Sequence, residues 1–121
     1  MDNIVQITEH DAKVTRIIDG DTIWVDLYIT ILGRRRTFHD TIVRFKDVDT
    51  PERGKPGYYD AKGHTYERLA GKTIRIRGDH EEMNGERWVA IPVVDGKSFC
   101  DELIEKGLAR KWYPGIGPWE Y

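Results

Sequence analysis

The sequence contains very little cysteine: Cys100 is alone among 121 residues. A single cysteine excludes a framework of internal disulfides and cannot by itself build a cysteine-ligated zinc site. The four histidines show no paired spacing, such as two histidines four residues apart on one helix, so a histidine zinc site is not predicted either. We expect Cys100 to be a small buried residue of a helix.

Long apolar runs are also absent, because the longest run is only a few residues. This excludes a membrane-spanning helix, and we expect no membrane partner. The first thirteen residues are acidic and polar, which is not the pattern of a signal peptide. The sequence therefore predicts a protein that is not exported.

An excess of charge of one sign is missing as well. Lys and Arg number 19 against 21 Asp and Glu, which gives a net charge of −2 and an isoelectric point near 6.1. This balance does not favour a strongly basic nucleic-acid binder. With 39% hydrophobic residues, the chain can build one packed core, and a second core would need roughly another 100 residues. We expect a single domain over 1–121, with its core at about 13–113 and a C-terminal tail at 114–121.

The first half of the chain has the pattern of paired strands. Residues 13–25 form two β-branched runs around an acidic turn at 19–22, and residues 23–31 alternate apolar and polar side chains with a period of two. Gly33 and the three arginines at 34–36 predict an exposed basic turn. A returning strand is expected over 37–48, with a bulge near Ile42 and Val43.

The second half mixes helices with a second hairpin. Residues 49–57 are rich in Pro and Gly and predict a loop, residues 58–69 have a modest helical pattern, and 72–77 and 87–94 read as strands. Ser98 and Asp101 have the spacing of a capping box at the start of a short helix. Five strands and two to three short helices in this order favour a small, partly open OB-fold barrel, whose ligand face is made by loops.

Carboxylates are concentrated in two segments at strand ends, 19–22 and 44–52. Neighbouring carboxylates repel one another unless a cation neutralises them, and oxygen ligands of this kind favour Ca²⁺ or Mg²⁺. The alternative is that both segments are ordinary turns, because Asp, Gly and Pro are common turn formers.

Two arginines, Arg44 and Arg87, can present planar guanidinium groups to a phosphate. The alternative for each is a solvated surface charge. Arg44 stands five residues before Asp49, so in a straight strand the two side chains would lie on opposite faces. Only a bend or an end of the strand between them would bring them together.

Three segments in the right order, 14–25 with Asp-Gly-Asp-Thr, 43–52 with Asp-Thr-Pro-Glu, and 90–109 ending in Gly-Leu-Ala, resemble the staphylococcal nuclease (thermonuclease) family. The resemblance runs from about residue 13 to 113. It implies a staphylococcal-nuclease-like five-stranded OB-fold barrel with helices, and Ca²⁺-dependent hydrolysis of DNA and RNA phosphodiesters with little sequence preference, other divalent ions being possible. A monomer is expected.

The resemblance also implies a metal site. Asp21 and Asp49 would be the calcium carboxylates, the backbone carbonyl of Thr50 would be a third ligand, and Asp19 would be a neighbouring acid in the second layer of the site. Because such an ion takes about six to eight ligands, places would remain for water and a phosphate oxygen, which leaves an open catalytic position.

The same resemblance assigns the catalytic groups. Glu52 would activate or orient the attacking water, while Arg44 and Arg87 would bind the phosphate and its developing charge. Tyr113 matches an aromatic residue of the family's nucleotide pocket, where a base or sugar packs. Its alternative is a core aromatic at the end of a helix.

The sequence departs from the family at three places. An acidic residue, Glu86, separates Gly85 from Arg87. The first hairpin is longer than expected, and the segment between Glu52 and Lys72 is shorter. The arginines at 34–36 therefore either reach substrate or form a solvated hairpin tip.

A second function stays open, in which a non-catalytic domain binds nucleic acid or protein as a scaffold. Many family members are exported, whereas this sequence predicts a cytoplasmic protein or one encoded by a phage or mobile element.

Overall fold

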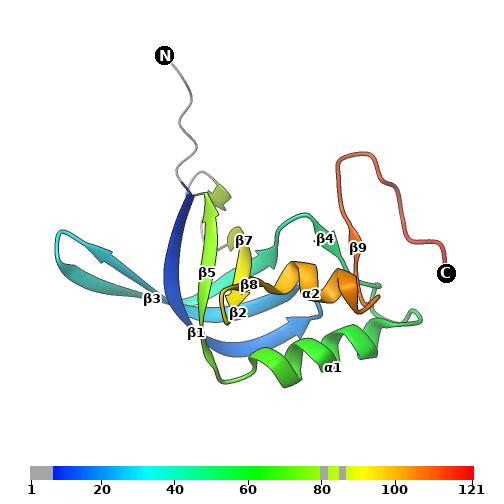
Figure 1. The fold of residues 1–121 in the computed structure, drawn as a ribbon, viewed down its shortest axis with the longest axis horizontal. Coiled ribbons are helices and arrows are strands. Elements are labelled where there is room, and N and C mark those ends of the chain that lie inside the picture. Colours follow the sequence, from blue (N-terminus) through cyan, green and yellow to red (C-terminus); the bar gives the residue numbers. More distant parts are fainter. Residues whose placement is uncertain (1–6, 80–81, 85–86) are drawn as a thin grey trace, which may run out of the picture.

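Five long strands close into a barrel in the computed structural model, which describes residues 7–79, 82–84 and 87–121 (Figure 1). The strands follow the order β3-β2-β1-β5-β7, and a parallel pairing of β3 with β7 joins the two edges. Their bounds are Ile7–Asp19 (β1), Thr22–Ile31 (β2), Arg34–Phe45 (β3), Thr73–Asp79 (β5) and Arg87–Val94 (β7). Closure leaves the barrel without a free edge between these strands. The predicted OB-fold barrel is confirmed.

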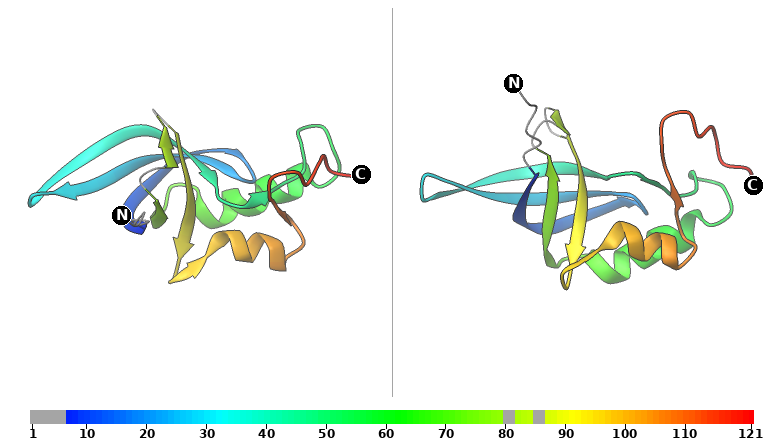
Figure 2. Two further views of the ribbon diagram at one scale, coloured as in Figure 1. Left: turned by 90° about the horizontal axis from the view of Figure 1, so that it is seen from above. Right: turned by 45° about the horizontal axis from the view of Figure 1, so that its top comes forward.

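Two helices lie together on one side of the barrel (Figure 2). Helix α1 spans Tyr58–Leu69 as predicted and packs against β1, and α2 spans Phe99–Glu105 and packs against β7. The Ser98 hydroxyl accepts a hydrogen bond from the Asp101 amide at 3.3 Å, which confirms the predicted cap. Neither helix is long and apolar enough to cross a membrane, among the residues that the structure describes.

Four short strands complete the fold. β4 (Val48–Asp49) pairs with β9 (Arg110–Lys111), and β6 (Met83–Asn84) and β8 (Lys97–Ser98) each pair with β7. The first of these pairs matters for the site, because it places the end of the chain beside residues 48–52.

The first half of the chain differs from its prediction in three details, two of them in the hairpin of β2 and β3 and one in β1. The turn of the hairpin is only Leu32 and Gly33, both with positive φ (53° and 75°), and this tight turn lets β3 start at Arg34, so the three arginines belong to the strand. The bulge lies at residues 39–40, where two residues oppose Asp26, because Asp40 adopts a φ of 55°. β1 begins at Ile7 because its first half pairs with β5.

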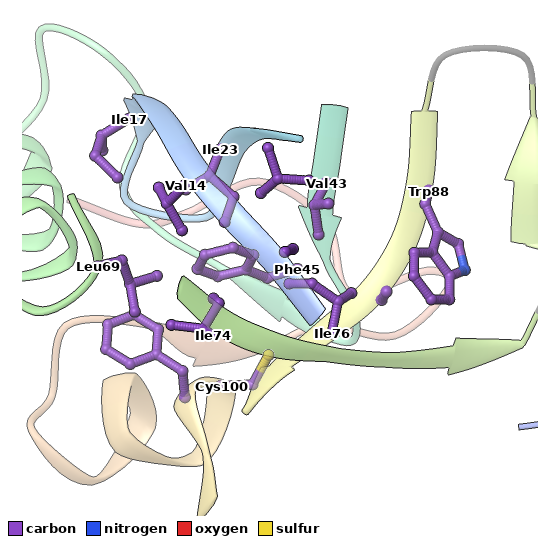
Figure 3. Close-up of a cluster of buried hydrophobic side chains, with 14 of the residues drawn as sticks. Val14, Ile17, Ile23, Val43, Phe45, Leu69, Ile74, Ile76, Trp88 and Cys100 are labelled. Carbon is purple, nitrogen blue, oxygen red and sulfur yellow. The ribbon is translucent and has the colours of Figure 1, made fainter. Parts of the chain in front are cut away.

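The core fills the barrel and the space beneath the helices (Figure 3). Phe45 of β3 meets Phe99 of α2 edge to face, with 5.9 Å between ring centroids. Cys100 is buried on α2 as predicted, and burial raises the pKa of its thiol to about 12. A thiol with this pKa is protonated at neutral pH and has a structural role.

An ion cluster joins the two helices. Arg68 of α1 donates from Nε and Nη2 to the two carboxylate oxygens of Glu102 on α2, both at 3.0 Å, and His64 Nε2 lies 2.7 Å from Glu102 Oε2. The hydrogen bonds from Arg68, supported by His64, lower the pKa of Glu102 against the opposing effect of burial.

Replacing Glu102 with glutamine is expected to lower the free energy of unfolding at pH 7 by about 1–2 kcal/mol, because charge-assisted hydrogen bonds are lost. A carboxylate whose pKa is lower in the folded state stabilises the fold above its unfolded pKa of roughly 4.3. That contribution disappears as the pH falls through the folded pKa. Urea unfolding at pH 7 and pH 3 measures the difference, with Glu105→Gln on the exposed part of α2 as control. An equal Glu102→Gln effect at both pH values would contradict the assignment.

Candidate active site

The acidic turn between β1 and β2 is held from behind by α1. Tyr58 donates its hydroxyl to Asp19 Oδ1 at 2.7 Å, and Thr65 Oγ1 donates to the Gly20 carbonyl at 2.8 Å. The hydrogen bond to Asp19 and burial both raise the pKa of Tyr58. The turn that carries Asp19 and Asp21 is therefore fixed to the helix and is not a loose surface loop.

Gly20 is required here because α1 approaches the turn closely. A Cβ atom at this position would lie 2.8 Å from Ala61 Cβ and 3.1 Å from Thr50 Cγ2. Gly20→Ala is expected to cost about 1–3 kcal/mol of stability through overpacking. Gly63→Ala on the exposed face of α1 meets no atom within 4 Å and is expected to stabilise the helix by about 0.5–1 kcal/mol. Thermal unfolding of both variants measures this contrast, and equal stabilities would contradict it.

Arg44 and Asp49 reach the same side of the barrel because β3 ends between them. The chain turns after Phe45, with Asp47 at a φ of 57°, and restarts as β4. Arg44 Nη1 then lies 3.3 Å from Asp21 Oδ2, and Nη2 lies 3.8 Å from Asp49 Oδ1. The strand thus ends between Arg44 and Asp49, as their five-residue spacing required. One guanidinium group lies between two carboxylates.

Asp21 is fixed by further hydrogen bonds. Its Oδ2 accepts from the backbone amide of Thr50 at 3.0 Å, and its Oδ1 accepts from Thr22 Oγ1 at 3.1 Å. Only 6% of Asp21 and 4% of Thr50 are exposed. Because a buried carboxylate must be paired, this network ties the start of β2 to the residue after β4.

A cavity of about 510 Å³ collects the predicted residues. The cavity is lined by Asp19, Asp21, Arg44, Asp49, Thr50, Glu52 and Arg87, together with Tyr58 and Arg53. Arg87 reaches it from the first residue of β7, where it pairs with Ile42 of β3. Gly85 and Glu86, where the sequence departs from the family, lie outside the described residues. Tyr113 does not line the cavity and is 57% exposed, so its role in binding a nucleotide stays a prediction.

Sequence reasoning missed Arg110. Its Nε and Nη2 atoms donate to Asp49 Oδ2 at 3.2 and 3.1 Å, and Nη2 also donates to the Gly117 carbonyl at 2.6 Å. The Trp119 ring covers this guanidinium, with its centroid 4.8 Å from Cζ. Asp49 therefore has an arginine on each side. No local pattern links positions 49 and 110, because their contact depends on the pairing of β4 with β9.

The predicted tail contributes a second missed contact. The Tyr121 hydroxyl accepts a hydrogen bond from the Glu52 amide at 2.9 Å, and the Tyr121 ring stacks against Trp119 with centroids 6.1 Å apart. Residues 117–121 thus pack against the loop that carries Glu52. The aromatic pair is the only signal of this docking in the sequence.

The donors of the site suit a hard divalent cation. Asp21 and Asp49 both lie within 4 Å of the Arg44 guanidinium. The two carboxylates are therefore close enough together to face one cation. Carboxylate and carbonyl oxygens are the ligands that Ca²⁺ prefers. Within residues 7–79, 82–84 and 87–121, no three acidic, histidine or cysteine side chains form a ready-made metal cluster. A cation would therefore take two side chains and add backbone oxygen or water.

The chain with this barrel and site is similar to proteins named as thermonucleases and endonucleases, one of which is prophage-derived. It is 33% identical over 113 residues to a thermonuclease of Staphylococcus hyicus, covering 87% of this chain and 62% of that protein. It is 34% identical to the SPbeta prophage-derived endonuclease YokF and 35% identical to endonuclease YncB, both of Bacillus subtilis strain 168. These two matches cover 85% of this chain and 34% and 48% of the relatives.

The chain spans between about one third and three fifths of the length of these relatives. No protein-family model matches it. The similarity nevertheless extends over most of this chain and agrees with the barrel. The curated relatives therefore support a staphylococcal nuclease-like (thermonuclease) family for this chain.

Proposed function

We propose that the protein is a Ca²⁺-dependent nuclease that hydrolyses phosphodiester bonds of DNA and RNA with little sequence preference. The observation that carries this proposal is the placement of Asp21, Asp49, Arg44, Glu52 and Arg87 around one cavity. Three curated relatives that are named as nucleases support it. A scaffold protein has no need to keep metal carboxylates, two arginines and a further acid around one cavity.

The calcium site would use the carboxylates of Asp21 and Asp49 and the backbone carbonyl of Thr50. When bound, the ion supplies positive charge that stabilises the phosphate oxygens in the transition state. Asp19 would lie in the second layer of the site, where the hydrogen bond that it accepts from the Tyr58 hydroxyl holds the acidic turn against α1. Arg110 holds the far oxygen of Asp49, which leaves the Oδ1 side turned toward Arg44.

The arginines would bind the scissile phosphate. A guanidinium donates two parallel hydrogen bonds to phosphate oxygens, and these bonds strengthen as negative charge develops during attack. Arg44 lies beside both carboxylates, and Arg87 approaches from β7, so a phosphate in the cavity can meet the two groups from different strands. Every nucleotide carries the same negatively charged phosphate, so binding through the phosphate explains the expected lack of sequence preference.

Glu52 would orient and deprotonate the attacking water. The water oxygen forms a bond to phosphorus and the bond to the leaving oxygen breaks. The water proton passes to the Glu52 carboxylate, and the leaving oxygen takes a proton from solvent. The loop around Glu52 is held by the amide hydrogen bond to Tyr121. No covalent intermediate with the protein is needed.

The test incubates the purified protein with single-stranded DNA, double-stranded DNA and RNA, each with Ca²⁺ and each with a chelator. We expect cleavage of all three polymers with Ca²⁺ and none with chelator. Cleavage that persists with chelator would overturn the metal dependence. Binding without cleavage, in Ca²⁺ and when Mg²⁺ or Mn²⁺ replaces it, would instead support the scaffold function.

A further inference from the structure

The hairpin of β2 and β3 extends beyond the barrel, away from the C-terminus (Figures 1 and 2). We call residues 28–38 the arm. They contain three arginines and no acidic residue, although the whole chain has a net charge of −2. The arm is therefore a positive projection on a molecule that is otherwise slightly acidic, which suits a polyanionic partner.

One face of the arm combines cations with apolar groups. Directly opposed residues of antiparallel strands place their side chains on the same face of the sheet. The pairs Leu27 with Phe38, Ile29 with Arg36 and Ile31 with Arg34 therefore form one face, which we call the arm face. Arg35 belongs to the opposite face, where its guanidinium covers the Tyr28 ring with 3.9 Å from Cζ to the centroid.

The outer part of the arm face leaves apolar side chains exposed to solvent, whereas Leu27 and Ile29 at its base are buried. Ile31 is 53% exposed and Phe38 is 45% exposed, and Leu32 at the tip is 97% exposed with a positive φ. A leucine that is almost fully exposed gains nothing from packing. Asparagine or glycine would also fit a turn with positive φ better than leucine does. Local choices that work against folding are expected at functional surfaces.

The arm face is continuous with the proposed active site. A second cavity of about 140 Å³ lies under the base of the arm, between Phe38, Ile29, Trp88 and Arg87. Arg87 also lines the larger cavity that holds Asp21 and Glu52. One arginine therefore borders both cavities, and a chain of phosphates leaving the site past Arg87 meets Phe38 first and then Arg36 and Arg34.

We propose that the arm face binds a single-stranded stretch of the nucleic-acid substrate beyond the scissile phosphate, an inference that rests on the proposed nuclease function. Arg34 and Arg36 contact phosphates, and Phe38 with the apolar cavity beside it takes the face of an unpaired base. Base faces are available for such stacking only in single strands. The arm thus adds binding along the polymer without reading its sequence.

The test measures binding of a fluorescent 20-nucleotide single-stranded DNA in Ca²⁺, with all variants built on Glu52→Gln so that the strand stays intact. The double variant Arg34→Ser/Arg36→Ser is expected to raise Kd roughly twentyfold at 0.1 M salt and to reduce the salt slope by about 1.4, which corresponds to two lost phosphate contacts. Phe38→Ser is expected to weaken binding at least about fivefold. The matched control Arg35→Ser, on the opposite face, should change Kd by less than about threefold.

When the arm variants are built in the protein that retains Glu52, they should leave kcat/KM for a dinucleotide unchanged and lower kcat/KM for the 20-mer. Equal effects of Arg35→Ser and of the double variant would overturn the arm face, as would unchanged binding by all of them. A dimer in sedimentation that Phe38→Ser dissociates, with DNA binding intact, would assign the face to a second copy of this chain and also overturn it. If the protein binds the strand through the arm but cleaves nothing, the nuclease function fails while the arm proposal stands.

Discussion

Replacing Arg44 with lysine is expected to lower kcat by about 10²- to 10³-fold, the usual effect of removing one preorganised donor to a developing charge. Lysine keeps the positive charge but cannot form two parallel hydrogen bonds to one phosphate. Arg44 also bridges Asp21 and Asp49, and its side chain is only 22% exposed. The lost catalysis therefore follows from geometry, since a cation remains beside the two carboxylates.

The Arg44→Lys measurement combines kcat and KM on DNA with the melting temperature. We expect a melting temperature within about 5 °C of the wild type, because a charge is retained. Arg110→Lys is the matched control, since Arg110 pairs with the same Asp49 but does not line the cavity, and it should keep kcat within about tenfold. An Arg44→Lys enzyme with wild-type kcat would contradict the role of Arg44.

Replacing Glu52 with glutamine is expected to lower kcat by about 10²- to 10⁴-fold, the range for loss of a general base. Glutamine has nearly the same shape, and the Glu52 contact with Tyr121 is made by the backbone amide, so the loop should stay in place. Binding of DNA is then expected to change little. The variant separates proton transfer from substrate binding.

The Glu52→Gln measurement compares single-turnover cleavage with Kd for the same oligonucleotide. Glu67→Gln, an exposed residue of α1, controls for the loss of one negative charge. A Kd that weakens in parallel with the rate would place Glu52 in binding and would contradict the proposed role in activating water.

Local sequence signals predicted the elements of the fold well. The capping pair Ser98 and Asp101 and the helical pattern over 58–69 identified both helices, because caps and periodicity are short-range properties. The bulge was predicted near Ile42 and Val43 but lies at residues 39–40, and β1 was predicted from residue 13 but begins at Ile7. Both depend on strand pairing, with β2 in one case and β5 in the other, and the sequence of a single strand does not contain that information.

The candidate site was predictable only in part. The resemblance to a known family supplied Asp21, Arg44, Asp49, Glu52 and Arg87, and all five line one cavity. Arg110 and Tyr121 could not be found in this way, because a long-range strand pair and a docked segment bring them to Asp49 and Glu52. Their contacts arise from tertiary structure, so their roles had no local pattern.

The most direct test of the account asks whether nuclease activity belongs to this cavity. Wild-type protein, Arg44→Lys and Glu52→Gln are purified in parallel, and cleavage of one end-labelled single-stranded DNA is followed in Ca²⁺. The account predicts cleavage by the wild type, abolished by chelator, and rates at least about 100-fold lower for both variants with their folds intact. Cleavage by both variants at the wild-type rate would contradict it.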